Sequence, residues 1–168
     1  MPYKMSAIPY LDFLSDAAEE IGAVNTVLNN GGKPTRQNTD APAAQKLIGE
    51  KLPWGEKSSI ILGAGGMAYA FAFALNQMGA KGFVTARNQS NLSQIAKMFN
   101  LTKIKWGEWN ELQDKIICNA TPIGMSSHKN KIDFPKKILA SFSVVFDAVA
   151  NSSETWLVKA AKNIILKL

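Results

Sequence analysis

The run Gly63-Ala64-Gly65-Gly66-Met67-Ala68 has the residue types that let a backbone approach a phosphate group closely. It lies between an apolar segment typical of a buried strand and one typical of a buried helix. In that setting Gly63 permits a tight turn, Gly65 admits a pyrophosphate and the small Ala68 lets helix pack on strand. Free N–H groups and the helix dipole attract phosphates. The run predicts a dinucleotide-binding turn, with a ligand-free structural turn as the alternative.

Arg87 lies about 20 residues beyond the glycines, at the end of the next predicted strand, where the ribose of a bound adenosine is expected. A carboxylate at this place would accept hydrogen bonds from a free 2′-hydroxyl. A guanidinium instead matches a 2′-phosphate and can stack on adenine. Arg87 and its neighbour Asn88 therefore favour NADP over NAD as the cofactor. The alternative is that Arg87 is a solvated loop residue.

A third candidate is the loop that begins with Asn119-Ala120-Thr121, directly after a predicted strand. Ligands of open parallel sheets bind beyond the carboxyl ends of the strands, so this loop should flank the nicotinamide half of a cofactor. The preceding Cys118 has no basic neighbour and is predicted to be a core residue. His128, the only histidine, lies in a polar loop and is given no function. No metal site is predicted, because the potential ligands show no characteristic spacing.

From residue 58 onward, predicted strands and helices alternate, which is typical of a parallel sheet with helices on both faces. The strands are expected at 58–62, 81–86, 103–106, 115–118 and 143–146, and the helices at 67–78, 90–99 and 154–168. We therefore predict an α/β fold with a doubly wound, Rossmann-like sheet.

The first part of the chain has a different pattern. Apolar spacing predicts a helix over residues 10–21, followed by a hairpin of residues 23–28 and 33–39. A second helix is expected over 41–52, with Thr39 or Asp40 as its N-cap. A proline and a glycine follow, so a boundary is predicted near residues 53–57. Residues 1–52 would form a fragmentary first lobe of a helix and a hairpin, and residues 53–168 a nucleotide-binding-type lobe.

The composition is that of an ordinary globular protein, with 46% hydrophobic and 19% charged residues among 168. No apolar run approaches the roughly 20 residues of a membrane span, and no secretory leader is recognised, so a cytoplasmic protein is expected. The net charge of +6 favours an anionic ligand. The basic residues are spread along the chain, so neither nucleic acid nor a membrane is an expected partner.

Seven short blocks, in order and at matching spacing, resemble the shikimate dehydrogenase family. They are Met1-Pro2-Tyr3-Lys4, Gly22-Ala23-Val24-Asn25-Thr26, Asn38-Thr39-Asp40, the run from Gly63 to Ala68, Ala86-Arg87-Asn88, Asn119-Ala120-Thr121-Pro122-Ile123-Gly124-Met125 and Asp147-Ala148-Val149. The resemblance implies NADPH-dependent reduction of 3-dehydroshikimate to shikimate, a step of aromatic amino acid biosynthesis, in a cleft between two lobes. It makes residues 1–52 part of the substrate-binding lobe and residues 53–168 the Rossmann-like NADP-binding domain.

The resemblance also implies roles for individual residues. It places the catalytic lysine at Lys4, its partner aspartate at Asp40 and a ligand of the substrate hydroxyls at Asn25. These residue types suit the reaction, because a ketone that accepts a hydride becomes an alkoxide, which needs a proton and a nearby positive charge. Lys4 can supply both. The alternatives are that Lys4 is a frayed terminal residue and that Asp40 serves only as a helix cap.

The chain also departs from the family pattern. Glycines of the family are replaced by Arg36, Ala41 and Ala43, which is expected to alter the backbone around Asp40. A tyrosine and a proline are replaced by Ala150 and Ser152. The family's serine pair for the substrate carboxylate and its terminal glutamine have no match here. Since catalysis depends on accurate placement of the substrate, weak or absent turnover is expected of this chain.

Three functions remain open from the sequence. The first is a shikimate dehydrogenase, the second a non-catalytic NADP-binding module or degenerate homologue, and the third a related quinate-type or folate-type dehydrogenase. Self-association through an apolar face of the first 50 residues is a further expectation.

Overall fold

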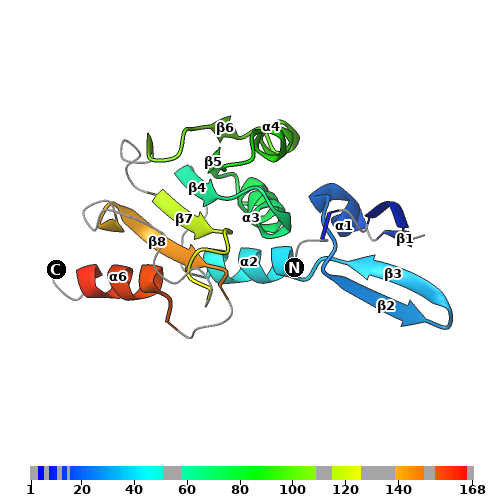
Figure 1. The fold of residues 1–168 in the computed structure, drawn as a ribbon. Helices are drawn as coiled ribbons and strands as arrows, with labels where there is room; N and C mark the ends of the chain where they lie inside the picture. Colours follow the sequence, from blue (N-terminus) through cyan, green and yellow to red (C-terminus); the bar gives the residue numbers. More distant parts are fainter. Residues whose placement is uncertain are drawn as a thin grey trace.

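The structure is a computed structural model and describes residues 4–5, 8–10, 13–14, 16–50, 58–108, 115–125, 139–149 and 154–165. These residues form a three-stranded sheet and a five-stranded sheet, with helices between and around them (Figure 1).

The larger sheet has the strand order β6-β5-β4-β7-β8, and all its neighbouring strands run parallel. Its strands are β4 (Ser58–Leu62), β5 (Lys81–Thr85), β6 (Thr102–Lys103), β7 (Lys115–Asn119) and β8 (Phe142–Asp147). After β4 the chain first adds strands on one side and then, from β7, on the other. The strand order therefore reverses at β4, the place where ligands of such sheets bind. The predicted doubly wound α/β fold is confirmed.

Alternate residues of the central strands face two different cores, as the pleat of a strand requires. Ile61 and Cys118 belong to the core made with α3 (Gly66–Gln77) and α4 (Gln89–Met98). Ile60, Leu62 and Ile117 pack with α6 (Trp156–Ile165) on the opposite face. Because both faces are covered, consecutive residues in these strands are apolar, as in Ile60–Leu62 and Ile116–Cys118, instead of alternating with polar ones.

The smaller sheet has the order β1-β3-β2. The predicted hairpin is confirmed, because β2 (Thr26–Asn30) and β3 (Lys33–Gln37) pair in antiparallel fashion. The third strand, β1 (Phe13–Leu14), was not predicted and pairs in parallel with Thr35 and Arg36 of β3.

The prediction of one continuous helix over residues 10–21 is wrong, although its last part is helical. The chain forms a 3-10 turn at Ile8–Tyr10, then β1, and only then α1 (Asp16–Ile21). The apolar spacing fitted a helix, but the free edge of β3 offers backbone hydrogen bonds that the segment satisfies as a strand. The third strand of the large sheet lies earlier in the sequence than the predicted range 103–106, because β6 spans only Thr102–Lys103. Trp106 consequently lies in a turn beyond this strand.

Helix α2 (Asp40–Gly49) packs along α3 (Figure 1). Ile21, Ala44 and Ile48 share one buried core with Phe71 and Leu75 of α3. The segment before β4 is thus joined to the five-stranded sheet through the core that it shares with α3. The predicted lobe boundary at 53–57 lies outside the described residues. Within the described part of the chain, no helix combines the length and apolar character needed to cross a membrane.

The positions that carry Arg36, Ala41 and Ala43 adopt ordinary backbone conformations. Asn100 is the one non-glycine residue with positive φ in the described part of the chain, so none of these three requires glycine. Arg36 is nevertheless unusual. It is only 1% exposed, and its Nε and Nη2 atoms have no hydrogen-bond partner among the residues that the structure describes. Buried guanidinium donors without partners destabilise a fold, because their lost hydration is not replaced.

We therefore expect Arg36→Met to raise the free energy of unfolding by about 1–3 kcal/mol, since methionine fills similar space without donors. Urea denaturation of the two proteins measures the difference. The matched control is Arg87→Met, which removes an exposed guanidinium and should change stability by less than about 0.5 kcal/mol. A loss of stability in Arg36→Met would show that the guanidinium is satisfied in solution.

Candidate functional site

The glycine run forms the predicted turn between β4 and α3. Gly63 has φ +110°, and a Cβ atom there would lie 3.2 Å from the carbonyl carbon and oxygen of Ala120. Gly65 occupies the N-cap of α3 in an extended conformation, and no atom lies within 4 Å of where its Cβ would point. Ala68 is fully buried. The turn therefore presents Gly65 to open space at the positive end of a helix, as phosphate binding requires.

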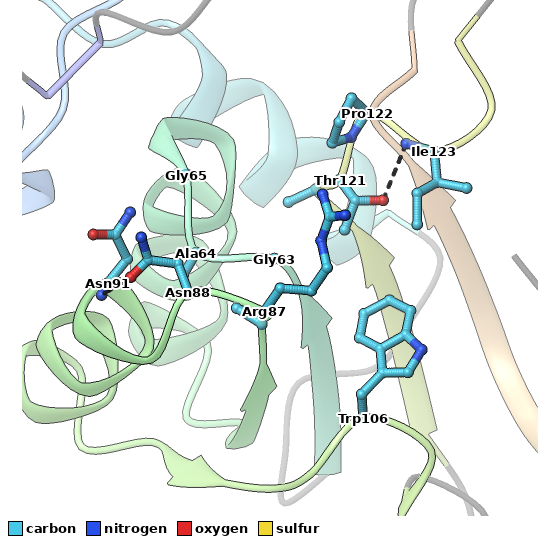
Figure 2. A pocket seen from close by; sticks show the side chains of 12 residues that line it. Gly63, Ala64, Gly65, Arg87, Asn88, Asn91, Trp106, Thr121, Pro122 and Ile123 are labelled. Carbon is cyan, nitrogen blue, oxygen red and sulfur yellow. Dashed lines mark hydrogen bonds between the residues drawn. The ribbon is translucent and has the colours of Figure 1, made fainter. Parts of the chain in front are cut away.

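A pocket of about 780 Å³ lies beyond the carboxyl ends of β4, β5 and β7. Among the described residues that line it, Arg87 alone is charged; the others are Gly63, Ala64, Gly65, Ala86, Asn88, Asn91, Trp106, Ala120, Thr121, Pro122 and Ile123. Figure 2 shows Arg87 extending from the end of β5 toward Thr121, while Asn88 and Asn91 lie beside the glycine turn. The volume of the pocket is within the range of small-molecule binding sites, and the positively charged Arg87 faces it.

Asn88 also has a structural role at the start of α4. Its side chain accepts a hydrogen bond from the backbone N–H of Asn91 at 3.0 Å, which makes it the N-cap of that helix. The cap fixes the direction in which the chain leaves β5. As a result, Arg87, between the strand and the cap, is directed over the pocket.

Asn119 is completely buried and organises the loop on the other side of the pocket. Its Nδ2 group donates to Asp147 Oδ1 at 2.9 Å and to the Ile123 carbonyl at 3.2 Å. Its Oδ1 atom accepts from the Thr121 hydroxyl at 2.6 Å and from the Thr121 N–H at 3.1 Å. The residue does not line the pocket itself; Ala120 and Thr121 do. Contact of Asn119 with a cofactor therefore stays a prediction.

Lys4 and Asp40, distant in sequence, form an ion pair between Nζ and Oδ2. The two side chains are 14% and 25% exposed, so both charges are largely removed from water. The Lys4 carbonyl accepts a hydrogen bond from the Val24 N–H at 2.8 Å, which anchors the lysine backbone to the start of the hairpin. The lysine stem lies against Gly66 at the beginning of α3. This ion pair therefore adjoins the glycine turn.

Asp40 is held by a residue that the sequence reasoning did not single out. Asn38, which is buried, accepts from the N–H groups of Asp40 and Ala41 at 3.0 and 3.1 Å and donates to the Ala23 carbonyl at 2.9 Å. Thr39 occupies the N-cap of α2, as one of the two predicted candidates, but its side chain makes no capping hydrogen bond, because Asn38 bonds the first N–H groups instead. An asparagine two residues before a helix could have signalled this.

Asn25 lies beside the same junction. Its Nδ2 donates to Thr39 Oγ1 at 3.0 Å, and its Oδ1 accepts from the Thr39 N–H at 3.0 Å. Since its neighbour Val24 bonds Lys4, the three candidate residues Lys4, Asn25 and Asp40 come together around one corner of the fold. The sequence separates them by as many as 36 positions, so only the resemblance suggested their proximity.

Two further residues were assessed from the sequence. Cys118 is fully buried in β7, where burial raises the pKa of the thiol far above its usual value. The thiol stays protonated near neutral pH, which confirms its interpretation as a core residue. His128 lies outside the described residues. Among those that are described, no group of three or more histidine, cysteine, aspartate or glutamate side chains could hold a metal ion.

Comparisons with known proteins agree with this arrangement. Residues 1–27 match the family described as shikimate dehydrogenase substrate binding domain. The chain is 34% identical to a shikimate dehydrogenase (NADP(+)) of Desulforamulus reducens over 97% of its length and 61% of the relative's. It superposes on the Aquifex aeolicus shikimate dehydrogenase structure with a TM-score of 0.84, at 34% identity over 98% of this chain and 61% of the other. The chain belongs to the shikimate dehydrogenase family.

Other family structures are similar. A Thermus thermophilus shikimate 5-dehydrogenase in complex with NADP(H) and shikimate gives a TM-score of 0.80, at 31% identity over 98% of this chain and 62% of that one. The chain spans about 61% of the length of the curated relative from Desulforamulus. The match to the family structures covers 98% of this chain and therefore includes the large sheet, the glycine turn and the Lys4–Asp40 ion pair.

The network around Asn119 gives a prediction about the pocket. Asn119→Ala removes the amide that holds Thr121, Ile123 and Asp147, leaving buried polar groups without partners. We expect the free energy of unfolding to fall by about 2–4 kcal/mol. Chemical denaturation followed by circular dichroism measures it. In the matched control, Thr121→Val removes only one hydroxyl and should cost about 1 kcal/mol. Equal losses in the two variants would contradict the central place of Asn119.

Proposed function

We propose that this chain is an NADP(H)-dependent oxidoreductase that interconverts 3-dehydroshikimate and shikimate. The observation that carries the proposal is the shielded Lys4–Asp40 ion pair beside the glycine turn, where a proton donor adjoins a dinucleotide-type pocket. The names of the relatives support it, since the curated protein from Desulforamulus is a shikimate dehydrogenase (NADP(+)).

The pocket suits a dinucleotide with an extra phosphate. Gly65 leaves open space at the N-terminus of α3 for a pyrophosphate, and Gly63 and Ala64 line the same cavity. Arg87 offers a guanidinium at the end of β5, the place of the 2′-phosphate in such folds. Thr121 and Ala120 close the pocket on the β7 side. We therefore assign the pocket-lining part of the turn, Gly63 to Gly65, together with Arg87, Asn88 and the loop after β7, to NADP(H). Contact of Gly66, Met67 and Ala68 with the cofactor stays a prediction.

The reaction then depends on the corner beside the turn. When bound, NADPH would supply the hydride that reduces the ketone of the substrate. Lys4 donates the proton that the substrate oxygen takes up, and its positive charge stabilises the developing alkoxide. Asp40 orients the Lys4 amine through the ion pair, and Asn25 donates to or accepts from a substrate hydroxyl. Asn38 acts indirectly, because it fixes the backbone from which Asp40 projects.

A quinate dehydrogenase is a second candidate, because one similar structure supports it. The quinate dehydrogenase from Corynebacterium glutamicum in complex with NAD superposes with a TM-score of 0.81, at 31% identity over 97% of this chain and 62% of that chain. Quinate and NAD therefore belong in the same assays as shikimate and NADP.

Cofactor binding is tested first, because it needs only the described pocket. We expect NADP to change the fluorescence of Trp106, which lines the pocket, and Arg87→Ala to weaken NADP binding about tenfold or more, with little effect on NAD. The control is Lys97→Ala, which removes an exposed cation of α4 that does not line the pocket. No binding of NADP at millimolar concentration, or equal losses for NADP and NAD, would remove the cofactor assignment.

Turnover is tested by the appearance of NADPH absorbance with shikimate or quinate as substrate. Lys4→Met should lower kcat by about 100-fold or more while NADP affinity stays within about twofold, because the amine supplies a proton but no cofactor contact. Asp40→Asn should lower kcat less, since it loosens the lysine without removing it. Unchanged turnover in Lys4→Met would contradict the proposed proton donor. A preference for quinate would favour the second candidate.

A further inference from the structure

Gly66 is the one glycine of the turn whose role the cofactor does not explain. It is the first residue of α3 and does not line the pocket, whereas Gly63, Ala64 and Gly65 all do. Its φ lies outside the left-handed region, so its backbone would accept any residue. Alanine at this position would also favour the helix. Some other contact must account for glycine here.

That contact is with Lys4. A Cβ atom on Gly66 would lie 2.6 Å from Lys4 Cβ, 2.9 Å from Lys4 Cδ and 3.2 Å from Lys4 Cγ. The first two separations are shorter than non-bonded carbon atoms tolerate. The atoms concerned belong to the near part of the lysine stem, so rotating the end of the side chain would not relieve the overlap.

Lys4 has little freedom to retreat, because it is held at both ends. Its carbonyl accepts from the Val24 N–H at 2.8 Å, and its Nζ is paired with Asp40. The stem between these attachments runs across the first residue of α3. A methyl group on Gly66 must therefore break the Val24 bond, displace the amine from Asp40 or push the helix away.

We propose that Gly66 is a positioning residue for Lys4: the absence of a side chain at the start of α3 is what allows the lysine amine to reach Asp40 beside the cofactor turn. The inference rests on the proposed function, in which Lys4 donates the proton. Gly65 and Gly66 then serve different partners although they are adjacent, since Gly65 faces open space where a pyrophosphate would lie.

The experiment compares Gly66→Ala with Gly65→Ala. Gly66→Ala should lower kcat by about 10- to 100-fold and leave NADP affinity within about threefold, because the proton donor is displaced while the pocket is intact. Gly65→Ala should weaken NADP binding by about tenfold or more, since its methyl group enters the space of the phosphates. The proposal is overturned if Gly66→Ala weakens NADP binding as much as Gly65→Ala.

A second measurement is independent of turnover. Gly66→Ala should lower the Tm of the otherwise unchanged chain. Added to Lys4→Gly, it should instead raise the Tm above that of Lys4→Gly alone, because only the helix preference of alanine then remains. The same sign of the Tm change in both backgrounds would overturn the proposal. If NADP binds and the Tm effect reverses but neither shikimate nor quinate is oxidised, the proposed function fails while the Gly66–Lys4 contact stands.

Discussion

At the carboxyl ends of β4 and β7 two backbone segments approach so closely that a side chain at Gly63, whose φ is +110°, would be strained. A Cβ atom on Gly63 would lie 3.2 Å from the Ala120 carbonyl, while the Ala120 N–H donates to Leu62 O at 2.9 Å and the Gly63 N–H to Thr85 O at 2.8 Å. These bonds join β4 to both neighbouring strands at the point where the strand order reverses. The glycine turn and the β7 loop consequently diverge from a fixed base, and the pocket is the space between them.

The loop on the β7 side keeps its shape through buried polar groups rather than regular structure. The two carboxylate oxygens of Asp147 accept from different partners: Oδ1 accepts from Asn119 Nδ2 at 2.9 Å and Oδ2 from the Thr155 hydroxyl. Thr155 Oγ1 in turn accepts from the Val158 N–H at 3.3 Å in the first turn of α6. The side-chain polar groups of Asn119, Asp147 and Thr155 are thereby all hydrogen-bonded, which makes their arrangement specific. Through this network a helix on the far face of the sheet helps to hold the residues that line the pocket.

The Lys4–Asp40 corner depends on a second set of contacts, between the early part of the chain and α3. Ile48 of α2 and Phe71 of α3 lie in one buried core, and Asn38 fixes the first turn of α2 through bonds to Asp40 and Ala41. The lysine reaches this corner across Gly66. The proposed proton donor thus lies against the same helix whose N-terminus faces the pocket, so the parts of the proposed site share one helix.

The sequence by itself determined the alternation of β4 to β8 with helices, the hairpin, the glycine turn, the place of Arg87 and the burial of Cys118, because apolar periodicity and glycine spacing are local signals. It misassigned Phe13–Leu14, where pairing with β3 outweighs helical spacing, and it did not reveal Asn38, Asp147 or Thr155 as network residues. Only the tertiary structure decided which distant side chains meet. The contacts between Lys4, Asp40 and Gly66 join segments up to 62 positions apart, and no local pattern encodes such a distance.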